Sequence, residues 1–325
     1  MRWGIVGHGS IAKTFMEAAR GIGHSVEVIV GRDSGRVSNF CSSYDVPESS
    51  TDLLSLVGAV DAAYIAVPHS GHCSSTVPLL EASVPVLCEK PLAVNEFEVS
   101  EMIRIAGSTQ TFLMEAMWTR HLPVYEKVLS WINEGKIGKV VLVEASFGFN
   151  APYVPESRLW NPDLAGGSLL DVGIYTLTLA DLIYGSQPEE FSAKADLSSE
   201  GIDTHLGVVA KYPNGGLARL GSAINAAIGF SGRVIGSEGM IEIPFFWQAE
   251  KAALTANDSS EEISIPHEVN GFEYQIREVQ RCLASGAVES DVVPWSWSLS
   301  MSRLMDEIRS EIGVIYPADK ESENG

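Results

Sequence analysis

The feature that most constrains this chain is a glycine-rich segment near its start, Gly7-His8-Gly9-Ser10-Ile11-Ala12. An apolar run, Trp3–Val6, comes directly before it, and an amphipathic helix pattern, Ile11–Arg20, follows. Between a strand and a helix, the first glycine permits a tight turn. The second lets the backbone approach a pyrophosphate, and the closing alanine lets the helix pack on the strand. Free N–H groups at the start of the helix then attract phosphates. An ordinary strand–turn–helix is the alternative. The segment predicts a dinucleotide-binding turn whose cofactor-binding residues are Gly7, His8, Gly9, Ser10 and Ile11.

Short apolar runs continue to alternate with helix patterns over the first 120 residues. This alternation indicates βαβ units and a parallel sheet with helices on both faces. We therefore expect residues 1–120 to form a Rossmann domain that binds a dinucleotide cofactor. The expected strands are Trp3–Val6, Val26–Val30, Ala62–Val67, Val84–Cys88 and Thr111–Met114, and the expected helices are Ile11–Arg20, Ser74–Ala82 and Asn95–Ala106.

The pattern changes after Arg120. Apolar residues alternate from Val141 to Phe149, which is typical of a strand with one buried face. Pro213–Gly216 is a turn signal between two more strand-like runs. We expect residues 121–325 to form an α+β domain for substrate binding and dimerisation, so the fold class is α/β with a second, large, mainly antiparallel open sheet. Its other expected elements are strands His205–Tyr212 and Leu217–Ile224, a hairpin near Ser237–Gly239, and helices Pro123–Asn133, Phe272–Leu283 and Leu299–Ile308.

Composition narrows the possible partners. The formal net charge of -20 would repel phosphate backbones and anionic lipid, so we expect neither nucleic acid nor membrane as a partner. No stretch of 18 apolar residues lacks a charge, and the first residues carry no signal-peptide pattern. The four cysteines are scattered and unpatterned, which favours reduced thiols and a cytoplasmic location.

The residues after the second expected strand bear on cofactor choice. An NAD site usually has an acidic residue there to bind the ribose 2′-OH. Here Arg32 lies where a guanidinium can make a bidentate contact with a 2′-phosphate, and Arg36 follows one helical turn later. Asp33 can serve NAD if the strand ends one residue later, and both arginines can also be ordinary surface residues. NADP is the favoured cofactor and NAD the alternative.

A second candidate group follows the strand that ends near Cys88. Ligands bind beyond the carboxyl ends of parallel strands, so Glu89 and Lys90 should lie beside the nicotinamide. A lysine there can hydrogen-bond a substrate hydroxyl and favour its alkoxide as hydride leaves. A surface lysine before a proline is an equally good interpretation of the tripeptide alone.

These motifs together resemble the glucose–fructose oxidoreductase/inositol dehydrogenase (Gfo/Idh/MocA) family. The resemblance includes the glycine loop, Val67-Pro68-His69-Ser70-Gly71-His72, Glu89-Lys90-Pro91 and Gly166–Tyr175. Within the family the chain looks closest to the branch of dimeric dihydrodiol dehydrogenases and NADP-dependent xylose dehydrogenases. Met114–Arg120 and a tyrosine at position 175, where many members have histidine, carry that closer match.

The resemblance implies that Lys90, Asp171 and Tyr175 are catalytic and meet at the substrate carbinol carbon. Asp171 and Tyr175 are four residues apart, so on a helix they share a face, although such a pair is more often structural. A phenol can take the hydroxyl proton while the lysine stabilises its anion. Because the family lines the nicotinamide with the loop after the third of the expected strands, cofactor contacts are implied for Pro68, His69 and His72.

Other expectations concern substrate and assembly. Trp118 and Arg120 lie at the domain junction and can line a substrate pocket, although a core tryptophan is nearly as good an interpretation. No second Cys/His cluster completes a metal site with His69 and His72, so no metal is expected. The expected reaction moves hydride between NADP and a secondary alcohol of a cyclic polyol, such as an aldopyranose like xylose or a trans-dihydrodiol. The alternatives are reduction of a keto-sugar of the anhydrofructose type, and a catalytically silent NADP-binding regulator.

The chain is also expected to form a homodimer. Its second sheet has helices enough to cover only one face, and the family resemblance implies dimers through this sheet. The open face should be apolar and should carry some of Val141, Val143, Phe147, Val209 and Leu220.

Overall fold

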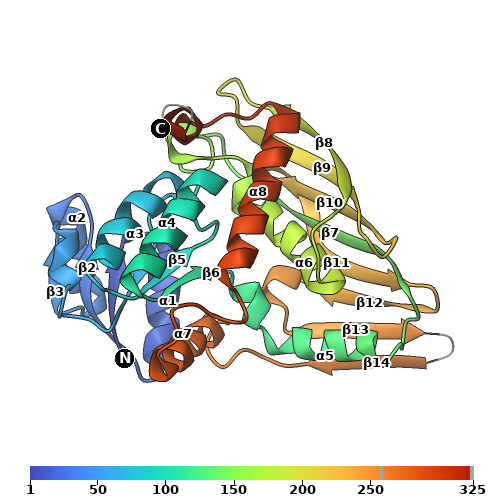
Figure 1. The fold of residues 1–325 in the computed structure, drawn as a ribbon, viewed down its shortest axis with the longest axis horizontal. Helices are drawn as coiled ribbons and strands as arrows, with labels where there is room; N and C mark the ends of the chain where they lie inside the picture. The colour runs from blue at the N-terminus through green and yellow to red at the C-terminus, as the bar shows by residue number, and fades with distance from the viewer. Residues whose placement is uncertain (257–258, 323–325) are drawn as a thin grey trace. The chain divides into compact units, whose positions relative to one another are not determined.

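The alternating apolar runs of the first part of the chain form a six-stranded parallel sheet (Figure 1). The structure, a computed structural model, describes residues 1–256 and 259–322. The strand order is β3-β2-β1-β4-β5-β6, so the direction of winding reverses between β1 and β4. In open α/β sheets ligands bind at such a reversal, beyond the carboxyl ends of the strands. The strands are β1 (Arg2–Val6), β2 (Ser25–Val30), β3 (Glu48–Ser50), β4 (Ala62–Ile65), β5 (Val86–Glu89) and β6 (Leu113–Ala116).

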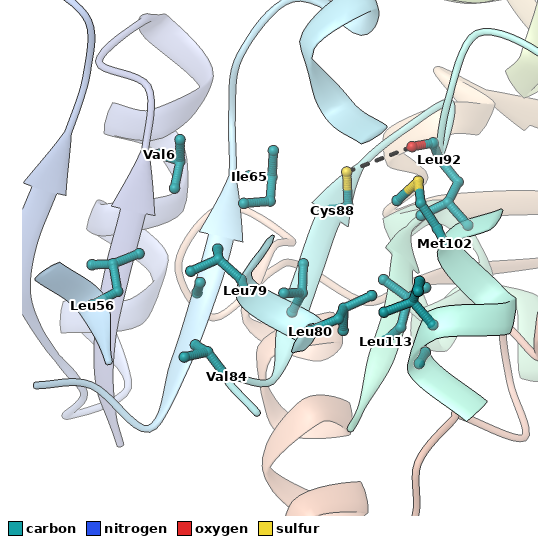
Figure 2. Packing of buried hydrophobic residues seen from close by; sticks show 14 of the residues in the cluster. Val6, Leu56, Ile65, Leu79, Leu80, Val84, Cys88, Leu92, Met102 and Leu113 are labelled. Atoms are coloured by element: carbon teal, nitrogen blue, oxygen red, sulfur yellow. Dashed lines mark hydrogen bonds between the residues drawn. The ribbon is translucent and has the colours of Figure 1, made fainter. Parts of the chain in front are cut away.

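Both faces of this sheet are buried, which explains the unbroken apolar strands. On one face, side chains of α3 and α4 pack against Val6, Ile65 and Leu113 (Figure 2). On the other, Phe15 of α1 stacks on Tyr64 of β4 with ring centroids 3.8 Å apart. The helices before residue 118 are α1 (Ser10–Gly21), α2 (Ser34–Tyr44), α3 (His72–Glu81) and α4 (Glu96–Thr109).

The pair α2 and β3 was not predicted from the sequence. The helix buries only Val37 and Cys41, so its hydrophobic periodicity is faint. Its start is set by a local hydrogen bond instead, because the Asp33 side chain accepts from the backbone N–H of Arg36 at 3.0 Å. Such a cap stabilises a helix without leaving an apolar pattern in the sequence.

The chain divides into two compact units, Met1–Trp118 with Glu268–Ser302, and Thr119–His267 with the chain from Arg303 onward. The sequence-based boundaries place all of 121–325 in one domain, whereas residues 268–302 belong to the first unit. Helix α7 (Glu273–Ser285) packs on α1 there. The backbone N–H of Leu113 donates to Val288 O at 3.1 Å, and Trp295 Nε1 donates to Leu113 O at 2.9 Å. The return segment thus covers the edge strand β6.

The second unit is built on an eight-stranded sheet in the order β14-β13-β12-β11-β7-β10-β9-β8. Only β7 and β10 pair in parallel; the other neighbours are antiparallel. The strands are β7 (Val140–Asn150), β8 (Glu190–Leu197), β9 (Asp203–Lys211), β10 (Leu217–Ala223), β11 (Asn225–Gly236), β12 (Gly239–Pro244), β13 (Lys251–Ala256) and β14 (Ser259–Ser264). The remaining helices are α5 (Pro123–Asn133), α6 (Ile174–Tyr184) and α9 (Pro317–Ser322), while α8 (Trp295–Ile312) passes from the first unit to the second.

Helix α6 packs against β7, β10 and β11 and is the buried core helix of this unit. By length and composition the run Pro162–Tyr184 could cross a membrane, but 83% of its apolar window is buried inside the structure. A buried core helix of a folded domain passes the same test of length and hydropathy.

The exposed face of the sheet is less apolar than the sequence suggested. Val143, Phe147 and Leu220 are buried on the face that α6 covers, because side chains alternate along each strand. Only Val141 and Val209 of the predicted set are exposed. The centre of the exposed face instead holds Glu144, which forms ion pairs with Arg219 and with Arg233, the latter at 2.6 Å, among the small residues Ser146, Gly221 and Ser231.

Candidate active site

The glycine loop has the geometry that a dinucleotide requires. Gly7 has a φ of +111°, and a Cβ there would lie 2.3 Å from the carbonyl oxygen of Ala66. Gly9 directly precedes α1, a Cβ there would meet no atom within 4 Å, and no side chain caps the first N–H groups of α1. Backbone and helix start are therefore open to a pyrophosphate, as the sequence predicts for this loop.

The residues after β2 bear on the choice between NADP and NAD. The Asp33 carboxylate caps α2, and this hydrogen bond to Arg36 N–H lowers the pKa of Asp33. Arg36 Nε also lies 3.8 Å from Asp33 Oδ2. The exposed Arg32 side chain makes no hydrogen bond or ion pair within residues 1–256 and 259–322. The imidazole of His8 reaches the same strand end, since a Cβ on Gly31 would lie 3.0 Å from its Nδ1. The acid that could serve NAD is thus already engaged in the helix cap.

The loops after β4 and β5 are joined by a buried histidine. His72 Nδ1 lies 2.8 Å from Pro91 O, and its Nε2 lies 3.0 Å from Val67 O. Burial, with a smaller effect of the nearby Lys90 charge, lowers the pKa of His72 to about 4. With both ring nitrogens against backbone carbonyls and no exposed surface, His72 has no nitrogen left for a cofactor. His72 therefore holds the two loops together. His69 is 8% exposed, and its ring centroid lies 5.7 Å from that of His72.

Lys90 stands at the carboxyl end of β5 and is 9% exposed. Buried carboxylates surround this strand end. Glu89 accepts a hydrogen bond from Tyr64 Oη, and Glu115 Oε1 accepts from the N–H of Leu92 at 3.1 Å. Burial raises the pKa of Glu115 to about 7; the Glu89 charge raises it further, while a Ser298 hydrogen bond, the Leu92 N–H and the Lys90 charge oppose the rise. In the sequence Glu115 lies within the motif Met114–Arg120, and its position on an otherwise apolar, buried strand is the signal that could have singled it out.

Trp118 and Arg120, predicted to line the substrate pocket, have other contacts in the units to which they belong. Trp118 is buried and packs against Phe272 in the first unit, with ring centroids 4.8 Å apart. Arg120 Nη1 donates to Asp181 Oδ2 at 2.7 Å in the second unit. Part of that guanidinium is therefore committed to α6, and substrate contact by either residue remains a prediction.

In the second unit, the loop Gly166–Ser168 leads into a π-helical turn, Leu169–Gly173, which continues directly as α6. Asp171 lies on this turn and is 6% exposed. Arg158 Nη1 donates to Asp171 Oδ1 at 2.7 Å, and about half of the Arg158 side chain is exposed. Sequence reasoning missed Arg158, because nothing in the loop 151–161 marks this arginine as a partner of Asp171.

Tyr175 follows on the first turn of α6 and is 7% exposed. Its ring packs on Phe147 at 5.7 Å between centroids, and Phe147 in turn stacks on Trp247 at 4.0 Å. The aromatic neighbours hold the phenol ring in one place. Asp171 and Tyr175 are thus brought onto one helical segment of the second unit, while Lys90 belongs to the first unit. Their action in one reaction remains a prediction.

Within the described residues, no group of three or more His, Cys, Asp or Glu side chains is arranged to hold a metal ion. Cys41, Cys73, Cys88 and Cys282 are free thiols.

Comparison with known proteins agrees with the two-part architecture. Residues 1–117 match the family model described as "Oxidoreductase family, NAD-binding Rossmann fold". Residues 125–242 match the model described as "GFO/IDH/MocA C-terminal domain". The chain is 34% identical to trans-1,2-dihydrobenzene-1,2-diol dehydrogenase of Mus musculus, over 98% of this chain and 99% of that one. The enzyme of the same name from Homo sapiens is 32% identical with the same coverage.

Solved structures share the fold. Aldose–aldose oxidoreductase from Caulobacter crescentus, complexed with glycerol, superposes with a TM-score of 0.87 at 22% identity, covering 96% of this chain and 97% of that one. A 3-ketoreductase from Actinomadura kijaniata, in complex with NADP and TDP-benzene, gives a TM-score of 0.87 at 23% identity, covering 96% and 98%. At these identities the likeness speaks for the fold alone.

Proposed function

Because this chain belongs to the GFO/IDH/MocA family of oxidoreductases, we propose that it is an NADP-dependent dehydrogenase for a secondary alcohol of a cyclic polyol. The observation that carries the proposal is the buried Lys90 at the carboxyl end of β5, in a Rossmann unit whose glycine loop is open to a dinucleotide. Ligands bind at that end of the strands in open α/β sheets.

NADP would be held by the glycine loop and by the residues that follow β2. The N–H groups at the start of α1 suit the pyrophosphate. Arg32 suits the 2′-phosphate because no side chain in the described part of the chain engages its guanidinium. The capping role of Asp33 supports NADP over NAD. The 3-ketoreductase of the same fold is itself described in complex with NADP. When bound, the cofactor supplies a hydride acceptor for alcohol oxidation, or a donor in the reverse direction.

We assign proton transfer to Tyr175 and electrostatic support to Lys90. The phenolate form of Tyr175, stabilised by the Lys90 ammonium, takes the hydroxyl proton of the substrate and becomes the neutral phenol as hydride leaves the carbinol carbon, which becomes a carbonyl. Asp171 orients the lysine or a substrate hydroxyl, with its own carboxylate held by Arg158. The family resemblance carries the assignment of these residues to one reaction, and their burial supports it, since charges act more strongly away from water.

The names of the relatives support the proposed substrate class. The full-length relatives are named for oxidation of a trans-dihydrodiol, and an aldose such as xylose fits the same chemistry. Reduction of a keto-sugar uses the same residues in the reverse direction. A silent regulator would not need a lysine, an aspartate and a tyrosine all kept at these positions. The free thiols fit a cytoplasmic enzyme.

We propose further that two copies pair through the exposed face of the eight-stranded sheet. Its small residues, Ser146, Gly221 and Ser231, allow a second sheet to approach closely, and Glu144 with its two arginines offers polar contacts. The interface would be more polar than the sequence suggested. A two-fold axis there would place identical Glu144–arginine groups near each other, so their pairing across the interface would set its register.

The proposed function is tested by following absorbance at 340 nm with NADP or NAD and a panel of xylose, glucose, myo-inositol and trans-1,2-dihydrobenzene-1,2-diol. We expect NADPH formation with at least one sugar or diol, and a kcat/KM that is higher with NADP than with NAD. Tight NADP binding without turnover in either direction, keto-sugars included, would favour the regulator instead.

A further inference from the structure

A buried carboxylate in the second unit has no role in the reaction as proposed. Asp203 is the first residue of β9 and is fully buried. Its Oδ2 accepts two hydrogen bonds, from Ser168 Oγ at 2.7 Å and from the backbone N–H of Leu169 at 2.7 Å. Leu169 begins the π-helical turn that carries Asp171. A side chain more than thirty residues away in the sequence therefore does what a local N-cap residue usually does.

The surroundings of Asp203 are built around this contact. Gly167 has a φ of +121°, and a Cβ there would lie 2.4 Å from Asp203 Oδ1, so a glycine is needed for the carboxylate to approach the turn. Ser168 Oγ also lies 2.8 Å from Ser222 Oγ on β10. The buried Tyr316 hydroxyl donates to Gly166 O on the other side of the same loop. Three separate chain segments thus converge on Gly166–Leu169.

Burial of the Asp203 carboxylate costs free energy, and its hydrogen bonds to the turn give a reason for that cost. A buried carboxylate loses its hydration, and burial raises the pKa of Asp203 to about 6 despite the two hydrogen bonds. A neutral amide or an apolar residue would fill the space without that penalty. Only an anion offers the turn a strong acceptor together with a favourable interaction with the positive end of a helix.

We propose that Asp203 is a positioning residue that fixes the π-helical turn and thereby the placement of Asp171. The half-exposed Arg158 holds the Asp171 carboxylate, and the buried Asp203 anchors the backbone of the same turn at Leu169. The consequence for the reaction rests on the role proposed for Asp171, whereas the anchoring of the turn does not. The two parts can therefore be tested separately.

The first test measures backbone hydrogen exchange by mass spectrometry on the full chain, in peptides that cover residues 166–175. Asp203→Asn keeps the size of the side chain and removes the anion, and Ser168→Ala removes one of its two hydrogen bonds. We expect exchange in these peptides to accelerate about tenfold or more in Asp203→Asn, and less in Ser168→Ala, while the Rossmann peptides keep their rates. Thr111→Val is the control, because it removes a buried hydroxyl of the first unit that donates to Leu80 O at 3.2 Å, and it should leave residues 166–175 unchanged. Unchanged exchange in both Asp203→Asn and Ser168→Ala would overturn the proposal.

The second test measures steady-state kinetics with NADP and xylose, or with the trans-dihydrodiol if it is turned over faster. Asp203→Asn should lower kcat by about 10- to 100-fold with little change in the dissociation constant of NADP, because a small misplacement of a reacting group is costly. Combined with Asp171→Asn, it should add little to the effect of Asp171→Asn alone. Full loss on Asp171→Asn with normal kcat in Asp203→Asn, or multiplicative effects in the double variant, would refute the link between the two residues. Full activity of Asp171→Asn together with accelerated exchange in Asp203→Asn would leave the anchoring intact and overturn the proposed role of Asp171.

Discussion

Removal of one arginine side chain tests cofactor choice most directly. Arg32 is exposed at the end of β2, while the neighbouring acid is used as the cap of α2. A charge-assisted, two-pronged contact with a 2′-phosphate contributes about 1.5–3 kcal/mol. Arg32→Ala should therefore raise the dissociation constant of NADPH by about 10- to 150-fold. NADH has no 2′-phosphate, so its dissociation constant should hardly change.

The neighbouring arginine should matter less. Arg36 is bound to the Asp33 carboxylate at 3.8 Å and is largely exposed, so a phosphate would have to compete with that ion pair and with solvent. An exposed ion pair contributes about 0.2–1 kcal/mol. Arg36→Ala should accordingly weaken NADPH binding by less than about tenfold, a smaller effect than that of Arg32→Ala.

The assay is a fluorescence titration of each variant with NADPH and with NADH at fixed ionic strength. Arg104→Ala is a suitable control, because it removes an exposed arginine of α4 whose partner is Glu101. Neither Arg32→Ala nor the control should shift the melting temperature much, since exposed substitutions usually stay within about 0.5 kcal/mol. Equal affinity of the unaltered protein for NADPH and NADH, or an equal loss of both in Arg32→Ala, would refute the reasoning.

Four further predictions concern chemistry, the glycine loop, titration and assembly. Tyr175→Phe should lower kcat by about 10²–10⁴-fold and leave cofactor binding intact. Lys90→Met should also lower kcat strongly, and the double variant should be little slower than either single variant. A raised KM at unchanged kcat in Tyr175→Phe would instead make Lys90 the proton acceptor. Gly7→Ala should abolish dinucleotide binding measured by the same titration, because its Cβ would lie 2.3 Å from a carbonyl oxygen. Between pH 5 and 8 the unaltered protein should lose up to about 3 kcal/mol of stability relative to Glu115→Gln, because the pKa of Glu115 is about 7 in the folded protein and lower in the unfolded chain, so the buried carboxyl must ionise in that window. Melting temperatures of the two proteins that run parallel across this pH range would contradict the prediction. Light scattering at micromolar concentration should show a dimer, and Arg219→Glu, which reverses a charge on the exposed sheet face, should convert it to the 35.0 kDa monomer.

Much of the first unit was readable from local sequence. Its strands are unbroken apolar runs because both faces of a parallel sheet are buried, and Gly7 and Gly9 mark the turn because a larger residue cannot adopt that backbone or allow that approach. Helix α5 was predicted with its bounds, Pro123–Asn133, since a proline starts it and its apolar residues recur four apart. Periodicity and turn chemistry are properties of neighbouring residues, so a sequence displays them without its fold.

The candidate site was only partly readable. The family resemblance pointed to Lys90, Asp171 and Tyr175, and the structure places each of them at a buried end of a strand or on a helical turn. Arg158, Glu115 and Asp203 were not selected, because each acts through contacts with residues that are not its neighbours in the sequence. A carboxylate that caps a helix from thirty-four residues downstream leaves no local pattern.

Two features were decided by tertiary structure alone. The sequence indicates that α7 is amphipathic but not which surface it packs against. Residues 268–302 belong to the first unit because α7 packs on α1 and Val288 hydrogen-bonds the edge strand β6. Likewise, the alternation in β7 predicts one buried face without saying which residues of the neighbouring strands share it. Strand register places Val143 and Leu220 under α6 and puts Glu144 and Arg219 on the opposite face. Neighbouring residues of a strand point to opposite faces, and pairing aligns them across the sheet.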